Sequence, residues 1–121
     1  MRRTSFALMM LLLPGTALAQ APVGVVAHGQ TLYESRCGGC HSIDTNRTGP
    51  KHRGVIGRRA GSVAGYDYSN ALKAARFTWT PQRIDQWLQG PSRLVPGTKM
   101  FFTVSDPADR AAIIAYLRTQ R

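Results

Sequence analysis

The chain has 121 residues and a formal net charge of +10, from 16 Lys and Arg against 6 Asp and Glu. Its length favours one domain, and its charge bears on partners and association rates, not on the fold. The basic residues are scattered and lack the aromatic interleaving of a nucleic-acid groove, so nucleic acid is not the expected partner. An acidic protein partner or an anionic membrane surface fits the charge better.

The first 19 residues have the pattern of a secretory signal peptide. Arg2 and Arg3 form a basic start, residues 6–13 form an apolar run, and Ala17 and Ala19 form a small-residue cleavage site. The apolar run is shorter than the roughly 20 residues that cross a bilayer. We therefore expect cleavage near Ala19 and a soluble periplasmic protein, with an uncleaved amphipathic anchor as the alternative. The expected divisions are a signal peptide over 1–19, a short tether over 20–27 and one domain over 28–121.

Helical patterns alternate with long irregular segments in the rest of the chain. Leu32, Tyr33 and Cys37 share one face of a helix that runs into the cysteine pair. An irregular stretch rich in Gly and Arg covers residues 42–66, and a loop of that length in a compact domain usually wraps something or is functional.

Capping residues predict three further helices. The predicted starts are Ser69, before a short helix over 70–75, Thr80-Pro81, before a helix that stops at Gly90-Pro91, and Asp106-Pro107, before the last helix. No stretch shows clear strand alternation. The predicted fold class is therefore all-α, with long loops.

Cys37-Gly38-Gly39-Cys40-His41 is a C-x-x-C-H sequence, the attachment motif for c-type haem. On a helical turn, positions i, i+3 and i+4 share one face. Both thiols can therefore bond to the two vinyl groups of one porphyrin while His41 turns its imidazole to the iron. Gly38 and Gly39 have no side chain to obstruct the macrocycle.

Three rival roles for the two cysteines compete with haem attachment. A thioredoxin-like redox pair would need a βαβ context, which is not visible. A zinc site needs four ligands, and the chain offers two Cys with His28, His41 and His52 in no finger spacing. A plain structural disulfide would leave the adjacent His41 without a role. Haem attachment is therefore the favoured interpretation.

Iron bound by one histidine has either an open sixth position or a second ligand. Beyond the predicted signal peptide, Met100 is the one methionine of the chain. It lies in a Pro/Gly-containing loop, and not on an apolar helix face where a packing methionine would be expected. As a ligand, its soft sulfur would favour ferrous iron and raise the potential.

With these residues the chain resembles a class I c-type cytochrome of the mitochondrial-like bacterial branch. The match runs from about Gly29 to Arg118. It rests on the following segments, which stand in the family's order: Cys37-Gly38-Gly39-Cys40-His41, Thr48-Gly49-Pro50, Gly54-Val55-Ile56-Gly57-Arg58, Gly65-Tyr66-Asp67-Tyr68-Ser69, Thr78-Trp79, Pro96-Gly97-Thr98-Lys99-Met100 and Ile114-Ala115-Tyr116-Leu117. The resemblance implies the small cytochrome c fold, a few helices and long loops wrapped around one covalently bound haem.

The resemblance also implies a role for each matching residue. Cys37 and Cys40 would carry haem c, with His41 and Met100 as the two axial ligands and Pro50 accepting the other ring N–H of His41. The other implied positions are Arg58, Tyr68 and Trp79 at the haem propionates, Phe102 beside the exposed haem edge, and Gly29 and Tyr33 where the first helix crosses the last. Core packing is the alternative for Tyr68 and Trp79, and a solvated loop charge is the alternative for Arg58.

His52 departs from the family's pattern, because the family commonly has an aliphatic residue packing on the haem at this position. A surface histidine is the favoured interpretation. A polar residue of the haem pocket and a rival ligand are the alternatives.

These expectations combine into a soluble, monomeric single-haem electron carrier, and not an enzyme. Its partners would be redox proteins with acidic docking surfaces (an oxidase, reductase, reaction centre or dehydrogenase), with peripheral membrane contact left open. The basic residues expected to rim the haem edge are Arg47, Lys51, Arg53, Arg93 and Lys99. One alternative is a peroxidase-like haem enzyme or gas sensor with a labile Met100, and another is a structural or metal-binding module.

Overall fold

A computed structural model describes Gly15 and residues 19–121, so nearly all of the predicted signal peptide lies outside the described residues. The helices, in chain order, are α1 (Val23–Arg36), α2 (Asn70–Ala74), α3 (Pro81–Gln89), α4 (Pro91–Leu94) and α5 (Pro107–Thr119). Within the described residues no strand forms, and one isolated bridge pairs Arg59 with Thr78. The all-α prediction is therefore confirmed. No helix in this part of the chain has the length and apolar character needed to span a bilayer.

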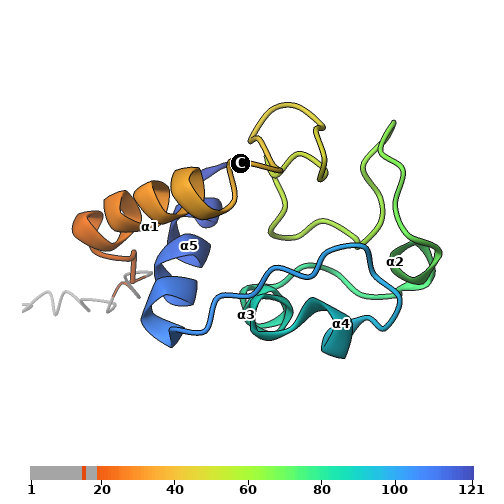
Figure 1. Cartoon of the computed structure of the whole chain (residues 1–121). Helices are drawn as coiled ribbons and strands as arrows, with labels where there is room; N and C mark the ends of the chain where they lie inside the picture. The colour runs from red at the N-terminus through yellow and green to blue at the C-terminus, as the bar shows by residue number, and fades with distance from the viewer. Residues whose placement is uncertain (1–14, 16–18) are drawn as a thin grey trace, which may run out of the picture.

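The two longest helices, α1 and α5, pack against each other, and the remaining helices and loops extend from this pair (Figure 1). Gly29 permits the close approach, because a Cβ there would lie 1.9 Å from the carbonyl oxygen of Ala112 on α5. Tyr33, one turn further along α1, packs its ring 5.3 Å from that of Tyr116. Gly29 and Tyr33 therefore lie at the helix crossing, as the resemblance implies.

The segment expected to be a tether is largely helical, since α1 already begins at Val23, after Pro22. Its first residues gave no helical signal because Val23 stays 86% exposed and Val25 is also exposed. In the first turn of α1 only Val26 packs partly against the core, and the pattern that marks an amphipathic helix is therefore weak in this stretch.

The three predicted N-caps form the expected hydrogen bonds. The side chain of Ser69 accepts from the Leu72 N–H, Thr80 accepts from Arg83, and Asp106 accepts from Ala108. The short helix α4 was not predicted, because Gly90-Pro91 indicates a helix end. Here Pro91 instead occupies the first turn of a new helix, where its missing N–H costs no hydrogen bond.

The core lies between α1, α3 and α5 and is completed by the loops. Its members include Leu32 from α1, Leu88 from α3, Ile113 from α5 and Val55 from the long loop over 42–66. Backbone hydrogen bonds hold that loop to distant segments, as from Gly57 N–H to the Trp79 carbonyl at 2.8 Å. The loop therefore wraps one side of the molecule in a defined path.

Candidate functional site

A cavity of about 420 Å³ opens between α1, α3, α5 and the loops. Its lining comes from segments far apart in the sequence, and apolar and aromatic side chains predominate. The structure brings every predicted site residue to this cavity: Cys37, Cys40, His41, Pro50, Arg58, Tyr68, Trp79, Met100 and Phe102.

The cysteines lie on one tight turn at the end of α1. The N–H groups of Cys40 and His41 both donate to the Cys37 carbonyl, at 3.1 and 2.8 Å. Both thiols are free, Cys37 partly buried and Cys40 exposed, and burial raises the pKa of the Cys37 thiol to about 11. Arg47, predicted only as a rim charge, donates to the carbonyls of Gly38 and Gly39 and so braces the turn.

His41 is held with one ring nitrogen occupied and the other free for a ligand bond. Its Nδ1–H donates to the Pro50 carbonyl at 2.8 Å, so the lone pair is on Nε2. Gly49 packs against the ring, because a Cβ there would lie 2.1 Å from His41 Cε1. Burial lowers the pKa of His41, although the Pro50 hydrogen bond acts in the opposite direction. The lowered pKa favours the neutral imidazole, which is the form that binds metals.

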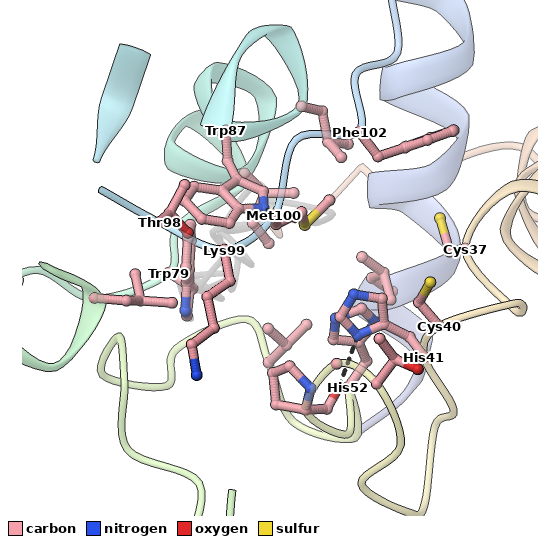
Figure 2. Close-up of a pocket in the computed structure, with 18 of the residues that line it drawn as sticks. Cys37, Cys40, His41, His52, Trp79, Trp87, Thr98, Lys99, Met100 and Phe102 are labelled. Carbon is pink, nitrogen blue, oxygen red and sulfur yellow. Dashed lines mark hydrogen bonds between the residues drawn. The ribbon is translucent and has the colours of Figure 1, made fainter. Parts of the chain in front are cut away.

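Met100 lies across the cavity from His41 (Figure 2). The indole Nε1–H of Trp87, on α3, donates to Met100 Sδ at 3.2 Å. The place of Trp87 on an apolar helix face favours core packing, but the structure also gives it a direct contact with the predicted ligand. Thr98 is buried beside this pair, 5% exposed, and also lines the cavity.

Arg58, Tyr68 and Trp79 also line this cavity. The Arg58 guanidinium donates to the carbonyl of Lys51 at 2.8 Å and also to that of Arg53, and burial lowers its pKa. The Tyr68 hydroxyl accepts from the Val63 N–H at 3.1 Å. Arg58 is therefore bound into the loop and is not a freely solvated charge.

Two aromatic side chains lie at the cavity mouth. Phe102 is 45% exposed and its neighbour Phe101 is 76% exposed, and both line the cavity. Of the five predicted rim residues, Lys99 lines the cavity. Its ammonium forms an exposed ion pair with Asp67, which does not line the cavity. Arg53 is engaged in an ion pair with Asp44.

The expectation of a surface role for His52 is wrong. His52 lines the cavity, and its ring stacks on that of His41 with centroids 4.0 Å apart and planes inclined by 20°. Burial, then the neighbouring His41 and Arg58, hold its pKa well below the usual value. The sequence feature that indicates a pocket position is His52 itself, a polar residue where the family commonly has an aliphatic residue packing on the haem.

Comparison with known proteins gives consistent matches over most of the chain. A family model described as Cytochrome c matches residues 26–121. A cytochrome c from Euglena viridis is 46% identical over 79% of this chain and 97% of its own length. A cytochrome c-type cyt cy from Rhodobacter capsulatus is 46% identical over 75% of this chain and 47% of its own length. The solved structure of cytochrome cH from Methylobacterium extorquens has a TM-score of 0.74 and 43% identity, covering 78% of this chain and 97% of that one.

The residues present fit the cofactor of this family. Two free thiols on one turn adjoin a histidine whose Nε2 is available, and a thioether lies across an apolar cavity. Among the described residues, no three His, Cys, Asp or Glu side chains are grouped as ligands for a lone metal ion. The chain belongs to the cytochrome c family, and it is an electron-transfer protein, not an enzyme, that carries haem c through Cys37 and Cys40.

Proposed function

We propose that this protein is a soluble carrier that shuttles one electron at a time between periplasmic or membrane redox partners, with His41 and Met100 as the axial ligands of its iron. One observation carries the proposal: the two side chains approach one cavity from opposite walls, each already held by a hydrogen bond. Pro50 holds His41 and Trp87 holds Met100. With haem bound, His41 and Met100 would fill both axial positions and leave no coordination site for a substrate.

The bound haem supplies the ferric–ferrous couple, and the protein's residues supply orientation and exclusion of water. Pro50 fixes the tautomer of His41, so that Nε2 is the donor atom. Trp87 directs an N–H dipole at the sulfur of Met100. Leu72, Leu88 and Ile113 line the cavity with apolar surface. A rigid, apolar site of this kind rearranges little when the charge of the iron changes.

Arg58, Tyr68 and Trp79 are assigned to the haem propionates. A buried carboxylate is costly without charge or hydrogen bonds nearby. Arg58, Tyr68 and Trp79 all line the cavity, and their guanidinium, hydroxyl and indole groups are the kinds of donor that such carboxylates need. Phe102, at the mouth, is assigned to the exposed haem edge where electrons leave.

The surface charge supports acidic redox proteins as partners, namely an oxidase, reductase, reaction centre or dehydrogenase. Removal of residues 1–19 takes away only Arg2 and Arg3 and no acidic residue, so the exported chain stays strongly basic.

The proposed location rests on the signal-peptide pattern alone. The expected species is a monomer in the periplasm that starts near Gln20. Mass spectrometry of the exported protein tests the cleavage site.

Absorption spectra of the matured protein and of Met100→Ala test the ligation. The protein is exported in a host with haem-attachment machinery. Low-spin spectra with a far-red iron–sulfur band that Met100→Ala abolishes support the proposal. A high-spin spectrum of the unmodified protein contradicts it and favours a haem enzyme or gas sensor with a labile Met100. Protein without covalent haem would favour a structural or metal-binding role.

A further inference from the structure

Two side chains that the proposed ligation does not use, Tyr33 and His52, form a polar pair against His41. The Tyr33 hydroxyl and His52 Nδ1 are hydrogen-bonded at 3.0 Å, and their rings meet edge-on with centroids 5.7 Å apart. Tyr33 is 4% exposed, and its ring is wedged against Tyr116 at the crossing of α1 and α5. The pair therefore links the best-packed part of the molecule to the ring of the axial histidine.

The backbone holds His52 at the same place. Its N–H donates to the Ser42 carbonyl at 3.0 Å, and the N–H of Arg53 donates to Ile43 at 2.8 Å. The segment that carries His52 is thus bonded to the two residues that directly follow His41. The two histidines lie on paired stretches of chain, and their rings meet face to face at 4.0 Å.

The hydrogen bond gives His52 an orientation that packing alone does not. Rotation about the second side-chain torsion of histidine is broad and roughly two-fold. The Tyr33 hydroxyl bond narrows this broad range to torsions at which the flat face of His52 covers the ring of His41. The Pro50 carbonyl restrains His41 at Nδ1, and the Gly49 backbone packs against the ring. The stacked His52 face adds a contact along the plane of the ring, which restrains its tilt.

We propose that His52 and Tyr33 are positioning residues that set the plane of the His41 imidazole. Tyr33 orients His52, and His52 fixes the tilt of His41 relative to the haem. This inference rests on the proposed ligation of iron by His41. An aliphatic side chain at position 52 would fill the space but would neither orient the ring nor give the buried Tyr33 hydroxyl a partner.

Proton NMR of the matured ferric protein tests the proposal, because the spread of the haem methyl resonances reports the plane of the axial imidazole. Tyr33→Phe and His52→Leu are each expected to change this spread. The double variant is expected to change it no more than His52→Leu alone, since both substitutions break one chain of contacts. Tyr116→Phe, which removes a neighbouring hydroxyl that does not contact His52, is the matched control and is expected to leave the spread unchanged.

The outcomes separate this proposal from the function on which it rests. An unmodified protein without low-spin His/Met haem would overturn both. Correct ligation, with a methyl spread in Tyr33→Phe and His52→Leu no different from that of Tyr116→Phe, would overturn the positioning role alone, as would additive effects of the two substitutions. If His52→Leu does not mature, the comparison of Tyr33→Phe with Tyr116→Phe decides. His52→Phe, which keeps a ring but loses the hydrogen bond, is expected to behave like Tyr33→Phe.

Discussion

Met100 accepts a hydrogen bond from Trp87, and a substitution of Trp87 measures how that bond affects the reduction potential. The N–H dipole points its positive end toward the sulfur, which disfavours the additional positive charge of ferric iron. Trp87→Phe is therefore expected to lower the reduction potential by up to about 40 mV, the one-electron equivalent of a net hydrogen bond of about 1 kcal/mol. A redox titration measures the shift. An unchanged or raised potential, with Met100 still ligated, would contradict the assigned role of Trp87.

Gly49 is expected to tolerate no side chain, because its Cβ would meet the ring of His41 at 2.1 Å. Gly49→Ala is expected to destabilise the matured protein by about 1–3 kcal/mol through overpacking and to perturb the His41 ligation. Chemical unfolding with the absorption spectrum as readout measures both effects. Gly24→Ala is the control, since nothing lies within 4 Å of a Cβ at Gly24 and this residue does not line the cavity. Equal stability of the two variants would contradict this packing.

Residue by residue, the sequence located the cavity's chemistry and, through the family resemblance, the contact of His41 with Pro50, but not the other side-chain contacts. The C-x-x-C-H spacing and the lone Met100 indicated the cofactor and its ligands, because both signals are local. The bonds of Trp87 to Met100 and of His52 to Tyr33 join segments 13 and 19 residues apart. Those contacts depend on how the loops fold around the cavity, and no spacing rule predicts them.

Among the elements, the crossing of α1 and α5 depends on the missing side chain of Gly29. Gly29→Ala is expected to push the helices apart, since its Cβ would clash with the Ala112 carbonyl, and to cost about 1–3 kcal/mol of stability. Gly24→Ala, in the same helix with open space around it, is expected to stabilise α1 by up to about 1 kcal/mol through helix propensity. Thermal unfolding compares the two. A Gly29→Ala variant as stable as the unmodified protein would contradict the observed crossing.

Arg110, on α5, hydrogen-bonds both to α3 and to the loop that follows Met100. Its side chain is 10% exposed and donates to Asp85 on α3 at 2.7 Å and to the carbonyls of Val104 and Ser105. Arg110→Met is expected to destabilise the protein by about 2–5 kcal/mol, because it leaves these acceptors without their donor. Denaturant unfolding measures the loss. Arg118→Met, at an exposed position of the same helix, is the control, and similar effects of the two substitutions would contradict the bridging role.

Helix starts were predictable where a cap marks them. Ser69, Thr80 and Asp106 accept the expected hydrogen bonds. The start of α1 and the whole of α4 were missed for different reasons. The first turn of α1 buries little apolar surface, since Val23 and Val25 are exposed and Val26 is partly buried. Gly90-Pro91 is compatible both with the end of one helix and with the start of another.

For the whole molecule, the strong positive charge sets how the protein meets its partners. Association with an acidic redox partner is expected to slow by roughly tenfold or more as ionic strength rises from about 0.01 M to about 0.15 M, because screening shortens the Debye length from about 30 Å to about 8 Å. Stopped-flow electron transfer at several salt concentrations measures this rate. A rate independent of salt, or one that rises with salt, would contradict an acidic docking partner.

An electron carrier of this kind needs an iron whose coordination sites are all occupied by the protein and the haem, and which can still gain and lose an electron. Stopped-flow absorption of the reduced, matured protein tests both properties, with carbon monoxide in one mixing experiment and a small outer-sphere oxidant in the other. Complete oxidation by one electron per haem and no carbon monoxide complex are expected, because the proposed ligands His41 and Met100 would occupy both axial positions. Rapid binding of carbon monoxide would show that the sixth coordination position of the iron is open or weakly held. The haem would then be one that binds an external ligand or substrate.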